Sequence, residues 1–439
     1  MIFPKATLFA YVSLALSLQV TAGPVPESKR SQGVGIPLRR HAGLQTEDGL
    51  FDLNKAVARM TRTQNKHTQN LINFQANKGY LPFTGAKIGS FLKVEDLLDI
   101  DLDLSLGKRQ SVPLFNQEDI EWLGPVSIGS NNQEFTIDFD TGSADFWIVS
   151  RSCNDTVCTS KHTYDFNAST TAQEQSGNFS IHYGDGSTAS GDLFTDSVTV
   201  AGVTAKDQFF AAVRNLSGTF DNDPIDGILG LAYPPLSKIK QDPFFTTANT
   251  QGAVPSNQFS FYFSSGSPGS NDSELFLGGT NPDLYTGDFD NVDVEGDKGY
   301  WSLGGASVSV NGKKAVDGLS TIIDSGTTIM YGPPDAVKEL YAKVNGSQEY
   351  SAARGLWSYP CATPPNITFN WGGKDWPIKG EHLNLGHADN SGENCVGSIA
   401  GQELNLGDNV WLLGNTFMKN VYTTFNFDTN QVGFAELKQ

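Results

Sequence analysis

Two segments of this 439-residue chain carry apolar and polar residues at helical spacing. Residues 54–78 have helical character and bear a series of basic side chains, namely Lys55, Arg59, Arg62, Lys66 and Lys78. Residues 333–346 begin with proline and end with glycine, and one face is apolar. That face consists of Val337, Leu340, Tyr341 and Val344. We predict a helix in each segment, and we assign the apolar face of the second to packing.

Two other apolar runs, residues 135–139 and 319–323, are rich in β-forming residues and break into turns. The composition supports the same picture, with 46 Gly, 28 Phe, 13 Tyr and 7 Trp but only 18% charged residues. This balance is typical of many short strands joined by tight turns. We therefore predict an all-β fold with few short helices. The length allows two lobes and additional segments.

The first 22 residues have the pattern of a secretory signal peptide. Lys5 precedes an apolar stretch over 6–20, and small residues lead to a cleavage site after Ala22. Beyond this leader no apolar run approaches the length that spans a bilayer, and the polar C-terminus excludes a lipid-anchor signal. We expect a secreted chain without a membrane anchor, with a vacuolar destination as the alternative.

Charge divides the remaining chain in two. Residues 23–109 have a net charge of +4, whereas residues 110–439 have −23, which with Lys5 gives −18 for the whole chain. An acidic body argues against nucleic-acid binding. The contrast predicts that the basic front segment covers the acidic body. Lys108-Arg109 stands at the boundary, so we expect a propeptide over 23–109, removed by another protease or by self-cleavage.

The four cysteines lie in the body, and an even number in a secreted chain indicates disulfides. The simplest pairing is Cys153–Cys158 and Cys361–Cys395. The body also contains seven Asn-x-Ser/Thr sequons, which predict glycosylation. They begin at Asn154, Asn167, Asn178, Asn215, Asn271, Asn345 and Asn366.

An internal repeat contains the candidate chemistry. Asp140-Thr141-Gly142-Ser143 and Asp324-Ser325-Gly326-Thr327 each follow a β-rich run. Each aspartate is followed 90 residues later by the glycine of an apolar-apolar-Gly sequence, Gly230 and Gly414. Two landmarks with the same spacing predict two copies of one lobe.

If the lobes pack about a pseudo-twofold axis, Asp140 and Asp324 meet across the cleft between them. Two close carboxylates share a proton over a wide acidic range. One can then accept a proton from water while the other donates to a carbonyl, which hydrolyses an amide without a covalent intermediate. The hydroxyls of the two turns can hold the carboxylates, and the glycines allow another backbone to approach. These hydroxyls belong to Thr141, Ser143, Ser325 and Thr327.

Other chemistries find less support. The six histidines have no ligand spacing, and neither a Gly-x-Ser-x-Gly sequence nor a phosphate-binding Gly-Lys-Ser/Thr sequence occurs. We therefore expect no metal and no cofactor. Asp138 lies two residues before Asp140 on the same side of the strand. It either adds like charge near the pair or faces solvent.

At these residues the chain resembles the pepsin-like aspartic proteases, the secreted fungal members most of all. The resemblance covers nearly all of residues 110–439 and rests on the two Asp turns and on segments 143–148, 183–187, 225–232, 411–417 and 430–435. It implies a bilobal fold with two β-barrel-like lobes, at 110–284 and 285–439. It also implies a monomeric endopeptidase that is active at acid pH on extended polypeptides and is inhibited by its own propeptide until activation.

The resemblance assigns roles residue by residue. Asp140 and Asp324 correspond to the catalytic pair, and Ser143 and Thr327 to neighbours that hydrogen-bond them. Tyr183, Gly184 and Asp185 correspond to a hairpin flap that closes over substrate, and Trp147 to the partner of the flap tyrosine. Gly142, Gly326 and Thr327 are expected to line the substrate site.

Two alternatives remain. A catalytically silent relative could use the cleft only for binding, but both aspartates, both glycines and Tyr183 are intact. An all-β glycoside hydrolase also uses paired carboxylates, but it has no need for two Asp-x-Gly turns in a repeat.

Asp185 yields a first prediction. Its carboxylate can pair with a lysine side chain directly before the scissile bond, because opposite charges attract across a closed cleft. We expect Asp185→Thr to abolish cleavage after Lys and to preserve cleavage after Phe or Leu, measured on matched peptides. An equal loss of both would contradict this role.

Overall fold

The computed structural model describes residues 33–41, 43–46, 48–93, 121–182, 188–217, 220, 223–265 and 272–438. The predicted signal peptide and the Lys108-Arg109 boundary lie outside the described residues. Among the described residues, no helix combines the length and the apolar character needed to cross a membrane.

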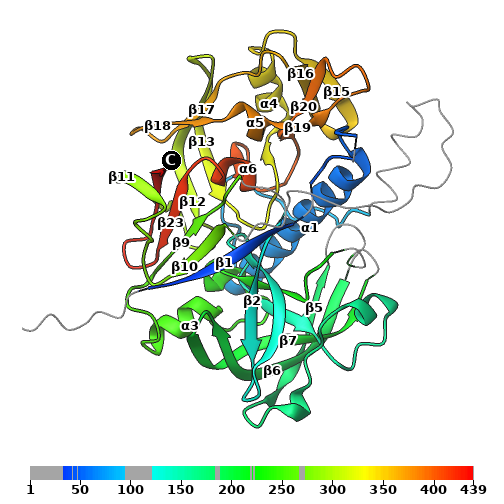
Figure 1. Ribbon diagram of the computed structural model, residues 1–439, viewed down its shortest axis with the longest axis vertical. Coiled ribbons are helices and arrows are strands. Elements are labelled where there is room, and N and C mark those ends of the chain that lie inside the picture. Colours follow the sequence, from blue (N-terminus) through cyan, green and yellow to red (C-terminus); the bar gives the residue numbers. More distant parts are fainter. Residues whose placement is uncertain are drawn as a thin grey trace, which may run out of the picture.

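The described chain is mostly β-structure, in agreement with the predicted class (Figure 1). The largest sheet runs in the order β11-β24-β23-β9-β10-β1-β2-β3-β8-β4-β7-β6-β5. Its strands are β1 (Val34–His41), β2 (Glu121–Ile128), β3 (Gln133–Asp140), β4 (Phe146–Val149), β5 (Gln173–His182), β6 (Thr188–Val200), β7 (Val203–Leu216), β8 (Gly227–Gly230), β9 (Gln258–Tyr262), β10 (Ser273–Leu277), β11 (Tyr285–Asp293), β23 (Tyr422–Asn426) and β24 (Gln431–Leu437).

The C-terminal part adds two smaller sheets. One runs in the order β18-β17-β12-β13-β22-β14-β21 and the other in the order β15-β16-β20-β19. Their strands are β12 (Ser302–Val310), β13 (Lys313–Ile323), β14 (Met330–Gly332), β15 (Gln348–Ser351), β16 (Leu356–Pro360), β17 (Ile367–Asn370), β18 (Asp375–Ile378), β19 (Asn384–His387), β20 (Asn394–Gly397), β21 (Ile399–Gly401) and β22 (Val410–Leu413).

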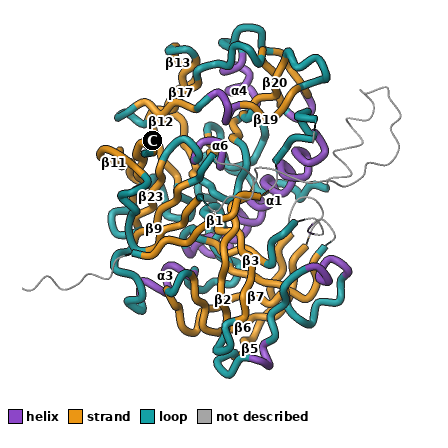
Figure 2. Tube along the Cα trace, in the orientation of Figure 1, coloured by secondary structure: helices purple, strands orange, loops and turns teal. Residues whose placement is uncertain are grey.

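Helices are few in the described part of the chain (Figure 2). They are α1 (Leu53–Lys78), α3 (Phe244–Thr250), α4 (Pro334–Tyr341), α5 (Gly380–Leu383) and α6 (Asn415–Met418), with 3₁₀ turns at η1 (Thr156–Ser160), η2 (Phe166–Ala168), η4 (Pro234–Leu236) and η5 (Ala352–Arg354). Both predicted helices are confirmed. The apolar face of α4 is buried, and α1 begins with an Asp52 side-chain cap and ends at Gly79 in the left-handed region.

The internal repeat is a structural repeat. In the first copy β3 is parallel to β8, β8 is antiparallel to β4, and β4 is parallel to β7. In the second copy β13, β22, β14 and β21 follow the same sequence of parallel, antiparallel and parallel pairs. Asp140 is in register with Gly230, and the Asp324 amide donates to the Leu413 carbonyl oxygen at 3.0 Å. The equal 90-residue spacings therefore arise from equivalent strand pairs.

The front segment is built into the body. β1 lies between β10 and β2 and pairs antiparallel with both. From there the chain leads into α1, which lies between the two halves of the body (Figure 1). α1 hydrogen-bonds to both halves: Asn73 Nδ2 donates to the Leu236 carbonyl oxygen at 2.9 Å, and Gln64 Nε2 to Gln402 Oε1 at 2.9 Å.

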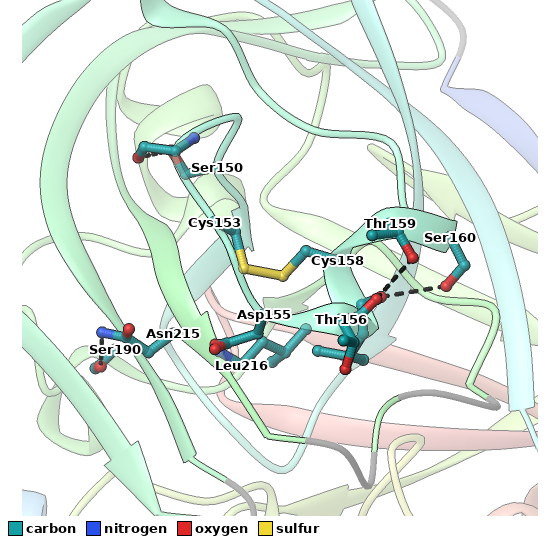
Figure 3. Close-up of a disulfide and its surroundings, with 12 residues drawn as sticks. Ser150, Cys153, Asp155, Thr156, Cys158, Thr159, Ser160, Ser190, Asn215 and Leu216 are labelled. Atoms are coloured by element: carbon teal, nitrogen blue, oxygen red, sulfur yellow. Dashed lines mark hydrogen bonds between the residues drawn. A yellow bond between two sulfur atoms is a disulfide. The ribbon is translucent and has the colours of Figure 1, made fainter.

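Both predicted disulfides, Cys153–Cys158 and Cys361–Cys395, are present. The first closes a short loop after β4 (Figure 3). Within this loop the Asp155 carboxylate accepts a hydrogen bond from the Leu216 amide at 2.8 Å, which ties the loop to the end of β7. The disulfide thus helps to fix the loop beside the β6–β7 hairpin.

Candidate active site

Asp140 and Asp324 are brought together from opposite halves of the repeat. Asp140 is the last residue of β3, and Asp324 directly follows β13. Both side chains are almost completely buried. A methyl group on Gly142 would meet the Asp324 carboxylate at 2.4 Å, and one on Gly326 would meet Asp140 Oδ1 at 2.2 Å. Each turn therefore lies directly against the carboxylate of the other.

Reciprocal hydrogen bonds lock the two turns to each other. The Thr141 amide donates to Ser325 Oγ and the Ser325 amide to Thr141 Oγ1, each at 2.9 Å. Thr141 Oγ1 donates to the Ile323 carbonyl oxygen at 2.9 Å, and Ser325 Oγ to that of Phe139 at 2.6 Å. These hydroxyls therefore join the two halves and set the separation of the carboxylates.

The other hydroxyl of each turn holds its own carboxylate. Ser143 Oγ donates to Asp140 Oδ2 at 2.6 Å, and Thr327 Oγ1 to Asp324 Oδ2 at 2.8 Å. The Gly142 and Gly326 amides donate to Oδ1 of the aspartate in their own turn at 2.9 and 3.0 Å. All the sequence-predicted residues of the two turns thus meet in one site.

Lys66 of α1 lies between the carboxylates. Its Nζ is 3.0 Å from Asp140 Oδ1 and 2.9 Å from Asp324 Oδ1. The next residue, His67, places Nε2 3.2 Å from Asp324 Oδ2. Both side chains are buried. The basic front segment and the acidic body are therefore in direct contact at the aspartate pair.

These contacts shift the protonation of every partner. Burial would lower the pKa of Lys66, but Asp140 and Asp324 outweigh it and raise the pKa. Burial would raise the pKa of Asp324, but Lys66 and His67 hold it far below its usual range. Burial raises the pKa of Asp140 despite Lys66. Lys66 thus favours the ionised form of the carboxyl pair, whereas burial disfavours it.

The surroundings of His67 disfavour its charged form. Burial lowers its pKa more than the hydrogen bond to Asp324 raises it, and the charge of Lys66 lowers it further. Within the described structure, its Nδ1 is buried without a hydrogen-bond partner. A proton on Nδ1 would therefore be left without an acceptor, which adds to the cost of charging the ring.

Other polar residues of α1 fit the helix into the body. Asn70 Nδ2 donates to the Gly142 carbonyl oxygen at 2.7 Å, directly beside the aspartate pair. Asn77 Nδ2 donates to the carbonyl oxygens of Pro235 and Ser237, each at 2.9 Å. These hydrogen bonds satisfy polar groups that α1 would otherwise bury without partners.

Arg59 and Arg62 form a second set of charged contacts. Arg62 Nη1 is 2.7 Å from Asp223 Oδ2, and Arg59 Nη1 is 3.7 Å from the same atom. Asp223 belongs to no motif of the sequence. The spacing of Arg59, Arg62 and Lys66 by three and four residues was the available signal, since it places them on one helix face.

The structure corrects one expectation and leaves others untested. Asp138 is buried and lines the same small cavity as Asp140, so the solvent-exposed alternative is wrong. Asp138 lies in β3, which pairs with β2 and β8, and the cavity is also lined by Arg62 and Lys66 of α1. The flap residues Tyr183, Gly184 and Asp185 lie outside the described residues, as does Asn271. The other six sequon asparagines are exposed, as glycosylation requires, and their occupancy stays a prediction.

A β-rich duplicated fold with two aspartates on matching Asp-(Thr/Ser)-Gly turns defines a protease-like site. Residues 121–437 match the family model described as "Eukaryotic aspartyl protease". An "Aspartic protease" of Phaffia rhodozyma is 39% identical over 321 residues, 72% of this chain and 76% of its own. "Cathepsin D" of Gallus gallus is 34% identical over 376 residues, 83% of this chain and 93% of its own.

A third relative, "Major aspartyl peptidase 1" of Cryptococcus neoformans, is 30% identical over 338 residues, 73% of this chain and 69% of its own. The chain belongs to the pepsin-like family of eukaryotic aspartyl proteases and is a hydrolase. The predicted resemblance is thereby confirmed.

The tight approach of the two turns gives a prediction. Gly142→Ala or Gly326→Ala should lower kcat/KM on a peptide substrate about 100-fold. The added methyl group would collide with the aspartate carboxylate of the other turn and displace it. Gly202→Ala is the control, since this glycine has a φ of 84° with nothing nearby. It should lower stability by about 1 kcal/mol and preserve activity. Equal kcat/KM for the three folded variants would contradict the prediction.

Proposed function

We propose that the protein is a secreted aspartic endopeptidase, made as a zymogen, that hydrolyses extended polypeptides at acid pH through Asp140 and Asp324. The observation that carries this proposal is the pair of buried carboxylates on locked, matching turns, reached by one lysine of the front segment. A pair so placed titrates as a unit and retains one proton over an acidic range.

In the proposed mechanism the space now held by the Lys66 ammonium belongs to a water molecule in the active enzyme. The ionised carboxylate of the pair takes a proton from this water, and the protonated one donates to the carbonyl oxygen of the substrate. Ser143, Thr327 and the two glycine amides keep both carboxylates oriented. Preorganised donors of this kind need no rearrangement during the reaction.

In the zymogen, α1 keeps water and substrate away from the pair. We propose that His67 makes this arrangement sensitive to acid. The charged or titratable groups facing it are Asp324, Lys66, Asp140 and, with ring centroids 5.7 Å apart, Tyr300. Because the pKa of His67 is lowered while α1 is bound, its contribution to binding is present above about pH 6.5 and is lost in acid.

The other charged contacts behave differently in acid. The pKa of Lys66 is raised, so Lys66 itself stays charged throughout the acidic range. Its pairing with Asp324 weakens only below about pH 3.8, because this contact lowers the pKa of Asp324. The pKa of Asp223 is lowered from 3.8 to about 2, so the contribution of its pairing with the arginines is complete above about pH 3.8 and is lost as the pH falls to about 2. Each pH unit below the ordinary value of His67 favours release by up to about 1.4 kcal/mol.

The proposed activity is tested first. Acid-treated protein should degrade an unfolded polypeptide at about pH 3, where one carboxyl of such a pair is protonated. Asp140→Asn should abolish degradation, as should pepstatin, which imitates the transition state for this family. Absence of cleavage by folded protein that lacks residues 1–109 would favour the silent binding module instead.

The zymogen proposal predicts two opposite shifts in activation. Lys66→Met should activate at higher pH, because two buried carboxylates lose their counter-charge at a cost of about 3–5 kcal/mol. His67→Gln should activate at a pH lower by about one unit, because the amide cannot take up a proton. The pH of half-maximal conversion is measured by electrophoresis and by released activity.

Matched controls are Lys55→Met, at the half-buried start of the same helix, and His162→Gln, an exposed histidine of the body. Both should convert as the wild type does. If Lys66→Met and Lys55→Met converted at the same pH, the proposed lock would be wrong.

A further inference from the structure

Asp223 is a buried acid in the body whose guanidinium partners both belong to the front segment. It lies between β7 and β8 and is only 6% exposed. Its Oδ2 accepts from Arg62 at 2.7 Å, with Arg59 at 3.7 Å. If the front segment leaves on activation, this carboxylate loses both arginines and stays in the body.

Phe220 completes a site suited to a guanidinium group. The Arg62 guanidinium carbon lies over its ring, 4.9 Å from the centroid. The ring in turn packs edge-on against the buried Trp147, with centroids 5.6 Å apart. A carboxylate beside an aromatic face binds arginine through both charge and stacking, which lysine can do less well.

The local backbone holds Asp223 and Phe220 in place. The Asp223 amide donates to the Phe220 carbonyl oxygen at 3.2 Å, and Asp223 Oδ1 accepts from the Ile225 amide at 3.3 Å. Lys161 Nζ donates to the Asp223 carbonyl oxygen. Lys161 belongs to the body, so one positive charge near the carboxylate remains after activation and favours the ionised form.

The site is close to the reacting centre. One small cavity is lined by Arg62 and Lys66 of α1 together with Asp138, Asp140 and Thr328 of the body. Along α1, Arg62 comes four residues before Lys66, and Arg59 comes seven residues before Lys66. These separations are about 6 and 10 Å along a helix. An extended peptide rises about 3.3 Å per residue. The two separations along the helix therefore equal the lengths of about two and three residues of an extended substrate, counted from the scissile bond.

We propose that Asp223 and Phe220 form a subsite for an arginine side chain of the substrate, two or three residues from the bond that is cut. The inference rests on the proposed function, since it requires α1 to leave and peptide to take its place. It differs from the predicted role of Asp185, which concerns the residue directly before the scissile bond.

The test uses the acid-activated enzyme at about pH 4 and peptides with a fixed apolar pair at the scissile bond. Arginine, lysine or norleucine is placed at the second or third residue on either side, and kcat/KM is measured for each. The wild type should prefer arginine over norleucine by about tenfold at one of these positions. Asp223→Asn should remove this preference and leave the norleucine peptide unchanged.

Phe220→Leu should reduce the advantage of arginine over lysine. Asp207→Asn is the control, because it removes the same charge from an exposed position on β7 and should change neither peptide. Equal rates for arginine and norleucine in the wild type at every position would overturn the subsite, whether or not the variants fold. Failure of the proposed function is distinct, because then no peptide of the series is cut.

Discussion

Two carboxylates buried side by side repel each other, and much of the structure depends on the hydrogen bonds and the positive charge that offset this repulsion. Asp140 and Asp324 are each bound by a glycine amide and a hydroxyl of their own turn. The Thr141 and Ser325 bonds prevent the two halves from moving apart. In the described state the Lys66 ammonium supplies the counter-charge. Burial makes every one of these contacts stronger than it would be in water.

The duplicated sheet explains why the two turns meet so closely. Equivalent strand pairs, β3 with β8 and β13 with β22, deliver each aspartate at the end of a buried strand. The front segment has no such repeat, yet it joins both halves through β1 and α1. Its helix is unusual in burying Asn, Gln, Thr and Lys side chains beside Leu71 and Phe74. Such a helix is stable only where the surrounding body supplies matching polar partners.

Charge complementarity between the front segment and the body operates at two places. At the aspartate pair one ammonium contacts two carboxylates, whereas at Asp223 two guanidinium groups converge on one carboxylate. All three acids belong to the body, and both sets of cations belong to α1. The basic residues of α1 therefore show which places on the body favour positive charge.

Part of the fold and of the candidate site was determined by the sequence alone. Short-range patterns predicted the β-rich class, both helices and the two Asp turns, and the structure agrees with each. The repeated spacing of 90 residues and the simplest pairing of the cysteines were also read directly from the sequence, and the structure confirms both. Which basic residue of α1 reaches the aspartates was not determined in this way, because it depends on how deeply the helix inserts and how it is rotated. Asp223, one of 48 acidic residues, has no local pattern that distinguishes it. Strand alternation placed Asp138 on the side of Asp140, but only the tertiary packing decided that it is buried. Local sequence thus specified the strands and turns, whereas burial and charge pairing between distant segments were decided by the tertiary structure.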